Sequence, residues 1–300
     1  MRVAITGGTG FIGKALTEAL TDRGDEVWII SRSKNLSTND PHIHFVTWSE
    51  LAENSDKLEG LDAIINLAGE SINQRWSPAA KQRILHSRQW AAARVTDLMN
   101  GLRRKPPLVI NASGISAYGS SRHEIFDESS PTSVTDYLSE VVKEWEAAAD
   151  AIPAERLVKL RVGVVLDKNG GAFPLMAMPY RLFGGGRIGT GQQGLSWIHL
   201  ADMVGLILFC LDHEQMEGPV NGSAPDPVTN DAFGRAIGKA MHRPHWFPVP
   251  AFLMKVLFGE MAVLLLEGQR AMPKKALDQG YIFQYPTVDS AMLQLVGRQS

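Results

Sequence analysis

Residues 6–13 read TGGTGFIG, and this glycine turn follows directly from the apolar segment MRVAI at residues 1–5. The glycines fit G-x-x-G-x-x-G from Gly7, or G-x-G-x-x-G from Gly8, and an amphipathic helical pattern begins at once after the turn. A strand, a glycine turn and a helix in this order direct free backbone N–H groups and the positive end of the helix dipole at a diphosphate. The sequence therefore predicts a dinucleotide site formed by Gly7, Thr9, Gly10, Phe11, Ile12 and Gly13.

The next strand-like segment, EVWIISRS at residues 26–33, indicates which dinucleotide is bound. Sites for NAD usually have Asp or Glu at the end of this strand, where the carboxylate holds the ribose hydroxyls. This strand ends instead in Ser31 and Arg32. A guanidinium group matches the oxygens of a 2′-phosphate, which a carboxylate would repel, so we expect NADP(H) as the cofactor. The alternative is that Arg32 is an ordinary solvated residue.

Composition excludes several classes of function. With 300 residues and 44% hydrophobic content, the chain can bury a large core, and its net charge of −2 offers no basic surface for nucleic acid or an anionic membrane. The single cysteine, Cys210, excludes an internal disulfide, and no histidine or carboxylate pattern has the spacing of metal ligands. We expect a cytoplasmic protein without a signal peptide or a metal, acting on a small molecule.

Strand-like and helical patterns alternate through the first half of the chain. We expect strands at Val3–Thr6, Val27–Ser31, His44–Thr47, Ala63–Leu67, Leu108–Ser113 and Val158–Val165, and helices at Ile12–Asp22, Pro78–Leu102 and Val134–Ala151. This alternation predicts an α/β fold with a doubly wound parallel sheet of the Rossmann type. Residues 1–166 should form the NADP-binding domain, with residues 195–222 returning to it. Residues 167–300 should form a smaller, mixed substrate-binding region that includes a C-terminal extension.

Motifs near the later strand ends resemble a known superfamily. Residues 61–69 read LDAIINLAG, 111–119 read NASGISAYG, 160–166 read LRVGVVL and 197–203 read WIHLADM. With TGGTGFIG, they resemble the extended short-chain dehydrogenase/reductase superfamily of NAD(P)-dependent epimerases and dehydratases. GESINQRW (69–76), GQQGLSWIHLADM (191–203) and the C-terminal extension are similar to its atypical branch of epimerase family proteins. The resemblance implies hydride-transfer chemistry and further cofactor contacts from Leu67, Ala68 and Gly69.

The chain departs from this superfamily at its catalytic positions. The superfamily uses Tyr-x-x-x-Lys, because residues i and i+4 share a helix face and the lysine can then assist the tyrosine and hold the nicotinamide ribose. Here Tyr137 is followed at that spacing by Val141, and Lys143 lies about 240° round the helix. The position of the catalytic serine or threonine, four residues before the tyrosine of the Tyr-Gly pair, is Gly114. Ser113 and Tyr137 are the best remaining candidates for handling protons.

The substrate contacts also differ from those of the superfamily. Nucleotide-sugar enzymes commonly have an arginine for the diphosphate two residues before the aromatic residue of the W/Y-I-H motif, and that position is Leu195 here. Arg187, in the preceding glycine loop, is an alternative contact for an anion. Arg75 and Trp76 should face the cleft beside the nicotinamide and offer a cation and a flat apolar wall. The alternative for this pair is a tryptophan that packs at the start of a helix beneath an exposed arginine.

Two functions remain open at this point. The first is an NADP-dependent oxidoreductase or epimerase that acts by hydride transfer at a carbinol or carbonyl carbon of a sugar-like or nucleotide-sugar substrate. The second is a non-catalytic NADP(H)-binding redox sensor or regulatory protein, which the missing lysine favours. The resemblance also implies a homodimer that forms through the two helices following the fourth and fifth strands.

Overall fold

The computed structural model of the protein describes residues 1–34 and 36–297 and contains a parallel seven-stranded central sheet. All six pairings between neighbouring strands of this sheet are parallel. In spatial order the strands are β12 (Gly218–Gly222), β7 (Arg156–Val162), β5 (Leu108–Gly114), β4 (Ala63–Asn66), β1 (Arg2–Thr6), β2 (Glu26–Ser31) and β3 (Ile43–Thr47). The strand order reverses at β1, which confirms the predicted Rossmann-type fold and places the ligand crevice above the carboxyl ends of β1 and β4.

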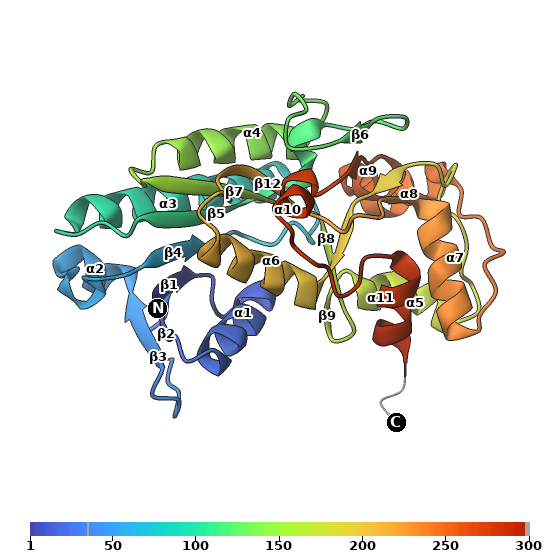
Figure 1. Cartoon of the computed structure of the whole chain (residues 1–300). Coiled ribbons are helices and arrows are strands. Elements are labelled where there is room, and N and C mark those ends of the chain that lie inside the picture. Colours follow the sequence, from blue (N-terminus) through green and yellow to red (C-terminus); the bar gives the residue numbers. More distant parts are fainter. Residues whose placement is uncertain (35, 298–300) are drawn as a thin grey trace.

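Helices cover both faces of this sheet (Figure 1). On one side lie α1 (Phe11–Asp22) and α6 (Leu200–Asp212), and on the other lie α2 (Trp48–Glu53), α3 (Pro78–Gly101) and α4 (Tyr137–Asp150). The central strands are therefore apolar on both faces, and all four residues of β4 are buried. Each face has its own core, one packed around α1 and α6 and the other around α3.

Two predicted elements differ from the observed ones for identifiable reasons. The helix expected from Val134 begins at Tyr137, because the Asp136 side chain caps it by accepting the backbone N–H of Ser139 at 2.8 Å. The strand expected at Val158–Val165 divides at Gly163 into β7 and β8 (Val164–Asp167). A Cβ at Gly163 would lie 2.7 Å from the Ser196 carbonyl oxygen, so only glycine lets the two backbones approach this closely. After this break, β8 leaves the main sheet and pairs with β11 (Trp197–His199) and β9 (Gly170–Gly171).

The second half of the chain forms a smaller helical region with short strands. Its core gathers around α5 (Phe173–Arg181), α7 (Asn230–Met241) and α11 (Val288–Val296). The remaining elements are η1 (Asp56–Leu58), η2 (Ile115–Tyr118), η3 (Gly259–Ala262), α8 (Ala251–Phe258), α9 (Val263–Leu266), α10 (Lys274–Asp278), and the strand pairs β10 (Gly194–Leu195) with β13 (Val228–Thr229) and β6 (Ile125–Phe126) with β14 (Arg270–Ala271). Within the described ranges, no helix is both long and apolar enough to cross a membrane.

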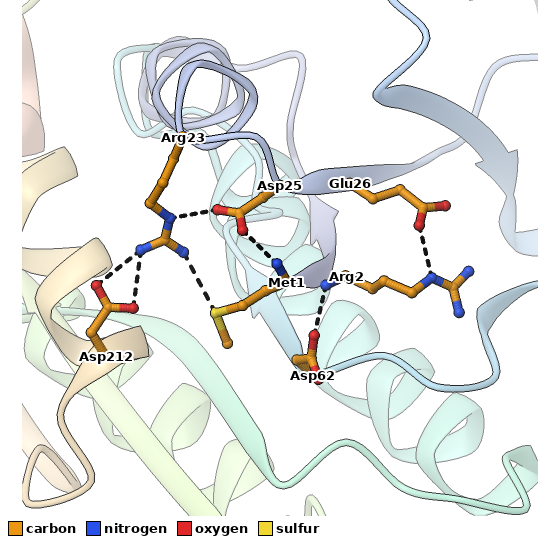
Figure 2. A network of polar contacts seen from close by, with 7 residues as sticks. All are labelled: Met1, Arg2, Arg23, Asp25, Glu26, Asp62 and Asp212. Atoms are coloured by element: carbon orange, nitrogen blue, oxygen red, sulfur yellow. Dashed lines mark hydrogen bonds and ion pairs between the residues drawn. The ribbon is translucent and has the colours of Figure 1, made fainter.

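Polar contacts join distant parts of the chain at the amino ends of the strands (Figure 2). The Asp25 carboxylate accepts hydrogen bonds from the Met1 ammonium and from Arg23 Nε, both at 2.6 Å. Arg23 also pairs with Asp212 at 2.9 Å, which links the end of α1 to the end of α6. Because β12 and α6 belong to the central sheet and its covering layer, the chain returns to the first half of the fold before forming its C-terminal extension.

Candidate functional site

The glycine turn between β1 and α1 has the geometry of a phosphate-binding loop. Gly7 has a φ of +71°, and a Cβ there would lie 2.9 Å from the Leu67 carbonyl group. The Gly10 N–H donates to the Gly7 carbonyl at 2.9 Å and Gly10 caps α1, while Thr9 and Gly10 are exposed. A Cβ at Gly13 would lie 2.3 Å from the Gly7 oxygen. The turn therefore requires Gly7, Gly10 and Gly13, the glycines of the G-x-x-G-x-x-G pattern. Because they have no side chains, the backbone at this helix N-terminus forms an open cradle that fits a diphosphate.

Buried amide side chains fix the ends of the strands beside this cradle. The Thr6 hydroxyl donates to Asn66 Oδ1 and accepts the Ala68 N–H at 3.2 Å. Asn66 Nδ2 in turn donates to Asn111 Oδ1 at 2.6 Å. These contacts cross from β1 through β4 to β5, so the loop carrying Leu67, Ala68 and Gly69 is held directly against the glycine turn. Phe11 and Ile12 are half-buried in the first turn of α1.

The end of β2 presents an open cation on the other side of the cradle. The Ser31 hydroxyl donates to the Ser33 carbonyl at 2.6 Å, and this contact folds the chain back after the strand. Arg32 is exposed, and its guanidinium makes no hydrogen bond or ion pair with any residue of the described ranges. A free guanidinium beside two serine hydroxyls suits a phosphate ester rather than a pair of ribose hydroxyls.

Ser113 lies in a buried ion-pair network that the sequence did not reveal. Its hydroxyl donates to Glu146 Oε1 at 2.7 Å, and Arg161 donates to both Glu146 oxygens at 2.8 and 2.9 Å. Burial alone would raise the pKa of Glu146, but the hydrogen bonds and charge of Arg161 outweigh it and hold that pKa below its usual range. Ser113 is 3% exposed, so its hydroxyl anchors α4 to β5 and offers little surface to a substrate.

Ser113 and Tyr137 are not brought together by the fold. Glu146, the partner of Ser113, is nine residues beyond Tyr137 on α4, which corresponds to about 13 Å along the helix axis. Between them, a Cβ at Gly114 would lie 2.9 Å from a methyl group of Val142. The superfamily's hydroxyl position is therefore closed by an apolar contact with α4, and a serine placed there would displace Val142.

Tyr137 begins α4 and packs against the start of α3. Its hydroxyl donates to the Lys81 carbonyl at 2.7 Å, and the Lys81 ammonium lies 5.0 Å from the centre of its ring. Burial raises the pKa of Tyr137, while the positive charge of Arg88 acts to lower it and the charge of Glu140 to raise it. Lys81 also pairs with Glu260, so the C-terminal extension reaches this part of the site.

The three predicted substrate residues lie in different settings. Trp76 is 7% exposed and its ring is 5.2 Å from that of Tyr137, while its Nε1 donates to the Ile72 carbonyl at 3.0 Å. The ring therefore packs between α3 and α4, as the packing alternative expects, and a role for Trp76 as a flat apolar wall for substrate stays a prediction. Arg75 and Arg187 are exposed, and neither side chain has a hydrogen-bond partner among the described residues. Their role in binding an anion stays a prediction.

Comparisons with known proteins agree with this architecture. The model of the NAD dependent epimerase/dehydratase family matches residues 3–145, and a domain of unknown function (DUF1731) matches residues 249–295. The epimerase family protein YfhF of Bacillus subtilis (strain 168) is 43% identical over 299 residues, which cover 99% of this chain and 98% of the relative. The chloroplastic SDR39U1 homologue of Arabidopsis thaliana is 39% identical over 97% of this chain and 86% of its own.

A solved structure is also similar over its whole length. The crystal structure of the human epimerase family protein SDR39U1 (isoform 2) with NADPH superposes with a TM-score of 0.89 at 36% identity, over 99% of each chain. The similarity includes the C-terminal extension, which also belongs to the resemblance found in the sequence.

Proposed function

The chain belongs to the epimerase family proteins of the NAD-dependent epimerase/dehydratase family, and we propose that it is an NADP(H)-dependent oxidoreductase or epimerase. Its reaction would be hydride transfer at a carbinol or carbonyl carbon of a sugar-like substrate. The observation that carries the proposal is an open phosphate cradle at Gly7–Gly13 together with the exposed guanidinium of Arg32 at the end of β2, which has no hydrogen-bond or ion-pair partner in the described ranges. The similar human protein was crystallised with NADPH, which supports the same cofactor for this chain.

Each part of NADP(H) would find a suitable group in this chain. The exposed backbone of Thr9 and Gly10 at the N-terminus of α1 would hold the diphosphate, and Arg32 with Ser31 would hold the 2′-phosphate. The loop at Leu67–Gly69 would lie along the half of the cofactor beyond the diphosphate, because it contacts the glycine turn from the β4 side. When bound, the nicotinamide supplies or accepts the hydride.

Tyr137 is the hydroxyl that we propose for proton exchange with the substrate. Ser113 is a weaker candidate, because its hydroxyl is engaged by Glu146 in a buried ion pair. Tyr137 is half-buried, and the single partner of its hydroxyl among the described residues is a backbone carbonyl. A neutral carbonyl is a weak competitor for a phenol, so a substrate oxygen that accepts this proton can replace it.

A second function is favoured by the same geometry. The superfamily's hydroxyl position is closed by Gly114 against Val142, and its lysine position is the buried Val141. These apolar contacts at both catalytic positions suit a protein that binds NADP(H) and senses the redox state of the cofactor without turnover. In that case the exposed cations Arg75 and Arg187 would face a partner and not a substrate.

The first experiment is native mass spectrometry of the purified protein, followed by titration with NADPH and NADH. Retained NADP(H) at near-full occupancy would support an epimerase, which recycles its cofactor, and reversible binding of NADPH would support a reductase or a sensor. Turnover of a panel of sugar aldehydes and ketones, lost in Tyr137→Phe, separates the enzyme from the sensor. Failure of the wild-type protein to bind NADPH would overturn the cofactor and both functions.

We further propose a cytoplasmic homodimer without nucleic acid, membrane or metal partners. The near-neutral charge supports the exclusion of nucleic acid. The helices α3 and α4, through which the resemblance implies a dimer, expose Trp90 beside the charged Arg83 and Glu140, whereas α8 exposes three large apolar side chains, Phe252, Val256 and Leu257. We therefore expect a second copy to contact α8, since large apolar surfaces rarely stay open. Light scattering should give a dimer that Val256→Asp dissociates, and an unchanged mass for this variant would contradict the interface.

A further inference from the structure

One face of α4 is directed at α3, and the superfamily's lysine position lies in the middle of it. Tyr137, Val141 and Trp145 occur at intervals of four residues and therefore share this face. Tyr137 contacts the Lys81 backbone, and Val141 is buried in one apolar cluster with Ile84. The α3 residue that reaches Trp145, one further turn along, is Arg88.

Arg88 lies between α4 and the loop that follows β4. Its guanidinium carbon is 4.9 Å from the centre of the Trp145 ring, and Nη1 donates to the Glu70 carbonyl at 3.0 Å and the Ile84 carbonyl at 2.9 Å. A Cβ at Gly69 would lie only 3.3 Å from the guanidinium carbon. The cation is thus held against the exposed backbone of Gly69 and within electrostatic reach of Tyr137.

The charge of Arg88 lacks a close carboxylate among the described residues. No ion pair joins its guanidinium to a carboxylate within 4.0 Å, and Nε and Nη2 donate to no acceptor of residues 1–34 or 36–297. Burial lowers the pKa of Arg88, and the negative charge of Glu70, which acts to raise it, offsets this effect only in part. Nε and Nη2 are not among the buried unsatisfied atoms of the described residues, so they remain accessible beside the ligand loop, where a bound ligand can supply acceptors to this partly desolvated cation.

The position of Gly69 indicates which part of a dinucleotide Arg88 would meet. Arg32 directly follows β2, on one side of β1, and would take the 2′-phosphate of the adenosine half. Gly69 follows β4, on the opposite side of β1, beyond the contact between Leu67 and Gly7. A dinucleotide that crosses the switch point between β1 and β4 therefore places its nicotinamide half beside Gly69 and Arg88.

We propose that Arg88 binds the hydroxyls of the nicotinamide-side ribose and adds a positive charge on the Tyr137 face of α4, together with Lys81, from α3 instead of α4. This inference rests on the proposed NADP(H) site. The free Nε and Nη2 donors would face the ribose, and Gly69 has no side chain that could block this approach. Position 141 then needs no charged side chain, because Arg88 on the neighbouring helix α3 brings a cation to the same face of α4.

The test compares two ligands that differ in the nicotinamide-side ribose. NADPH contains it, and adenosine 2′,5′-bisphosphate has the 2′-phosphate but lacks that ribose. In calorimetric titrations, Arg88→Met should weaken NADPH binding about tenfold and leave binding of the bisphosphate unchanged. Arg88→Lys should restore part of the NADPH affinity. The matched control is Arg94→Met, because Arg94 also lies over a tryptophan, Trp90, but pairs with Asp97 on the same helix.

A second measurement reports on Tyr137 without turnover. In protein labelled with 3-fluorotyrosine, the resonance that disappears in Tyr137→Phe should titrate at higher pH in Arg88→Met, and return toward the wild-type midpoint in Arg88→Lys. Unchanged NADPH affinity in Arg88→Met, or equal losses for both ligands, would overturn the role of Arg88. An unshifted Tyr137 midpoint in Arg88→Met would overturn its action on the tyrosine. Failure of the wild-type protein to bind NADPH would reject the proposed function itself, whereas the outcomes above reject only the role of Arg88.

Discussion

Arg32 is the residue on which the choice between NADP and NAD depends. Its guanidinium is exposed at the end of β2 and has no partner among the described residues. A charge-assisted contact with a phosphate contributes about 1.5–3 kcal/mol, and NADH has no phosphate at that position. Arg32→Ala should therefore raise the Kd for NADPH by about tenfold or more and leave the weaker binding of NADH unchanged, as measured by fluorescence titration.

Arg104→Ala provides the matched control for this prediction. Arg104 is also an exposed arginine, but it precedes β5 at the amino end of the sheet, away from the cradle. Its loss should change neither affinity. Equal weakening of NADPH by both substitutions would point to a general effect of net charge and remove the specific role of Arg32.

Glu146 is a buried carboxylate whose partners predict a pH dependence of stability. Glu146→Gln leaves Arg161 without its counter-ion and should lower the free energy of unfolding at pH 7 by about 3–5 kcal/mol. The pKa of Glu146 is depressed in the folded state, so its contribution is fully present above the usual value of 4.5 and is lost as the pH falls through the folded value. Urea denaturation should show the difference between the variant and wild type shrinking below pH 4.5.

Asp150→Asn tests whether burial is the reason for that effect. Asp150, the last residue of the helix that contains Glu146, pairs with Lys159 of β7 at 2.8 Å, but its side chain is 55% exposed. An exposed pair contributes about 0–1 kcal/mol, so this variant should unfold almost like the wild type. A loss as large as that of Glu146→Gln would mean that α4 is sensitive to any change of charge.

The residues that the sequence could identify are those whose role depends on their neighbours in the chain. The glycines, Ser31 and Arg32 were readable because one turn and one strand end contain them. Arg88 and Glu146 were not, since their partners Gly69, Trp145, Ser113 and Arg161 lie on other elements. The sequence shows that the lysine at position 141 is missing, but only the packing of α3 on α4 shows that Lys81 and Arg88 present their charges to this face of α4.

At the scale of elements, the approach of α1 to β1 depends on one glycine. A Cβ at Gly13 would lie 2.3 Å from the Gly7 oxygen and 2.7 Å from the Gly8 Cα, and neither backbone atom can move without opening the turn. Gly13→Ala should lower the free energy of unfolding by at least about 1–3 kcal/mol and abolish NADPH binding. Thermal unfolding and calorimetry measure the two effects separately.

Gly24 offers a control at the other end of the same helix. Its φ is +84°, yet nothing lies within 4 Å of a Cβ built there. Gly24→Ala should cost about 1 kcal/mol through its backbone conformation alone and leave NADPH affinity unchanged. If both variants lost NADPH equally, the close approach at Gly13 would not be what shapes the cradle.

The order of helices and strands in the first half could be predicted because local patterns determine it. Alternating apolar strands and amphipathic helices gave β1 to β5 and α1, α3 and α4 to within a few residues. The division of β7 from β8 depends on contacts of Gly163 with Ser196 and Gly222, which are distant in the sequence. The short strand pairs of the second half likewise join segments far apart in the chain, so a local pattern could not reveal them.

At the scale of the whole molecule, the C-terminal extension is attached to the helices that cover the central sheet. The buried Asp202 on α6 accepts the backbone N–H groups of Gln284 at 2.6 Å and Tyr285 at 2.9 Å. His199 contacts Gln294 on α11 at 3.0 Å. The extension also contacts α3 through the ion pair of Glu260 with Lys81, beside Tyr137. These attachments imply that the two parts of the chain unfold together.

Asp202→Ala tests this cooperativity, because the substitution leaves two backbone N–H groups without their acceptor. Each unsatisfied buried donor costs about 1–3 kcal/mol, so the variant should unfold at lower urea concentration. If the extension and the central sheet form one cooperative unit, far-ultraviolet circular dichroism and tryptophan fluorescence should shift together in a single transition. Two separate transitions in the wild-type protein would show that the extension is an independent unit. In that case Glu260 and its neighbours could leave Tyr137 while the cofactor cradle stayed folded.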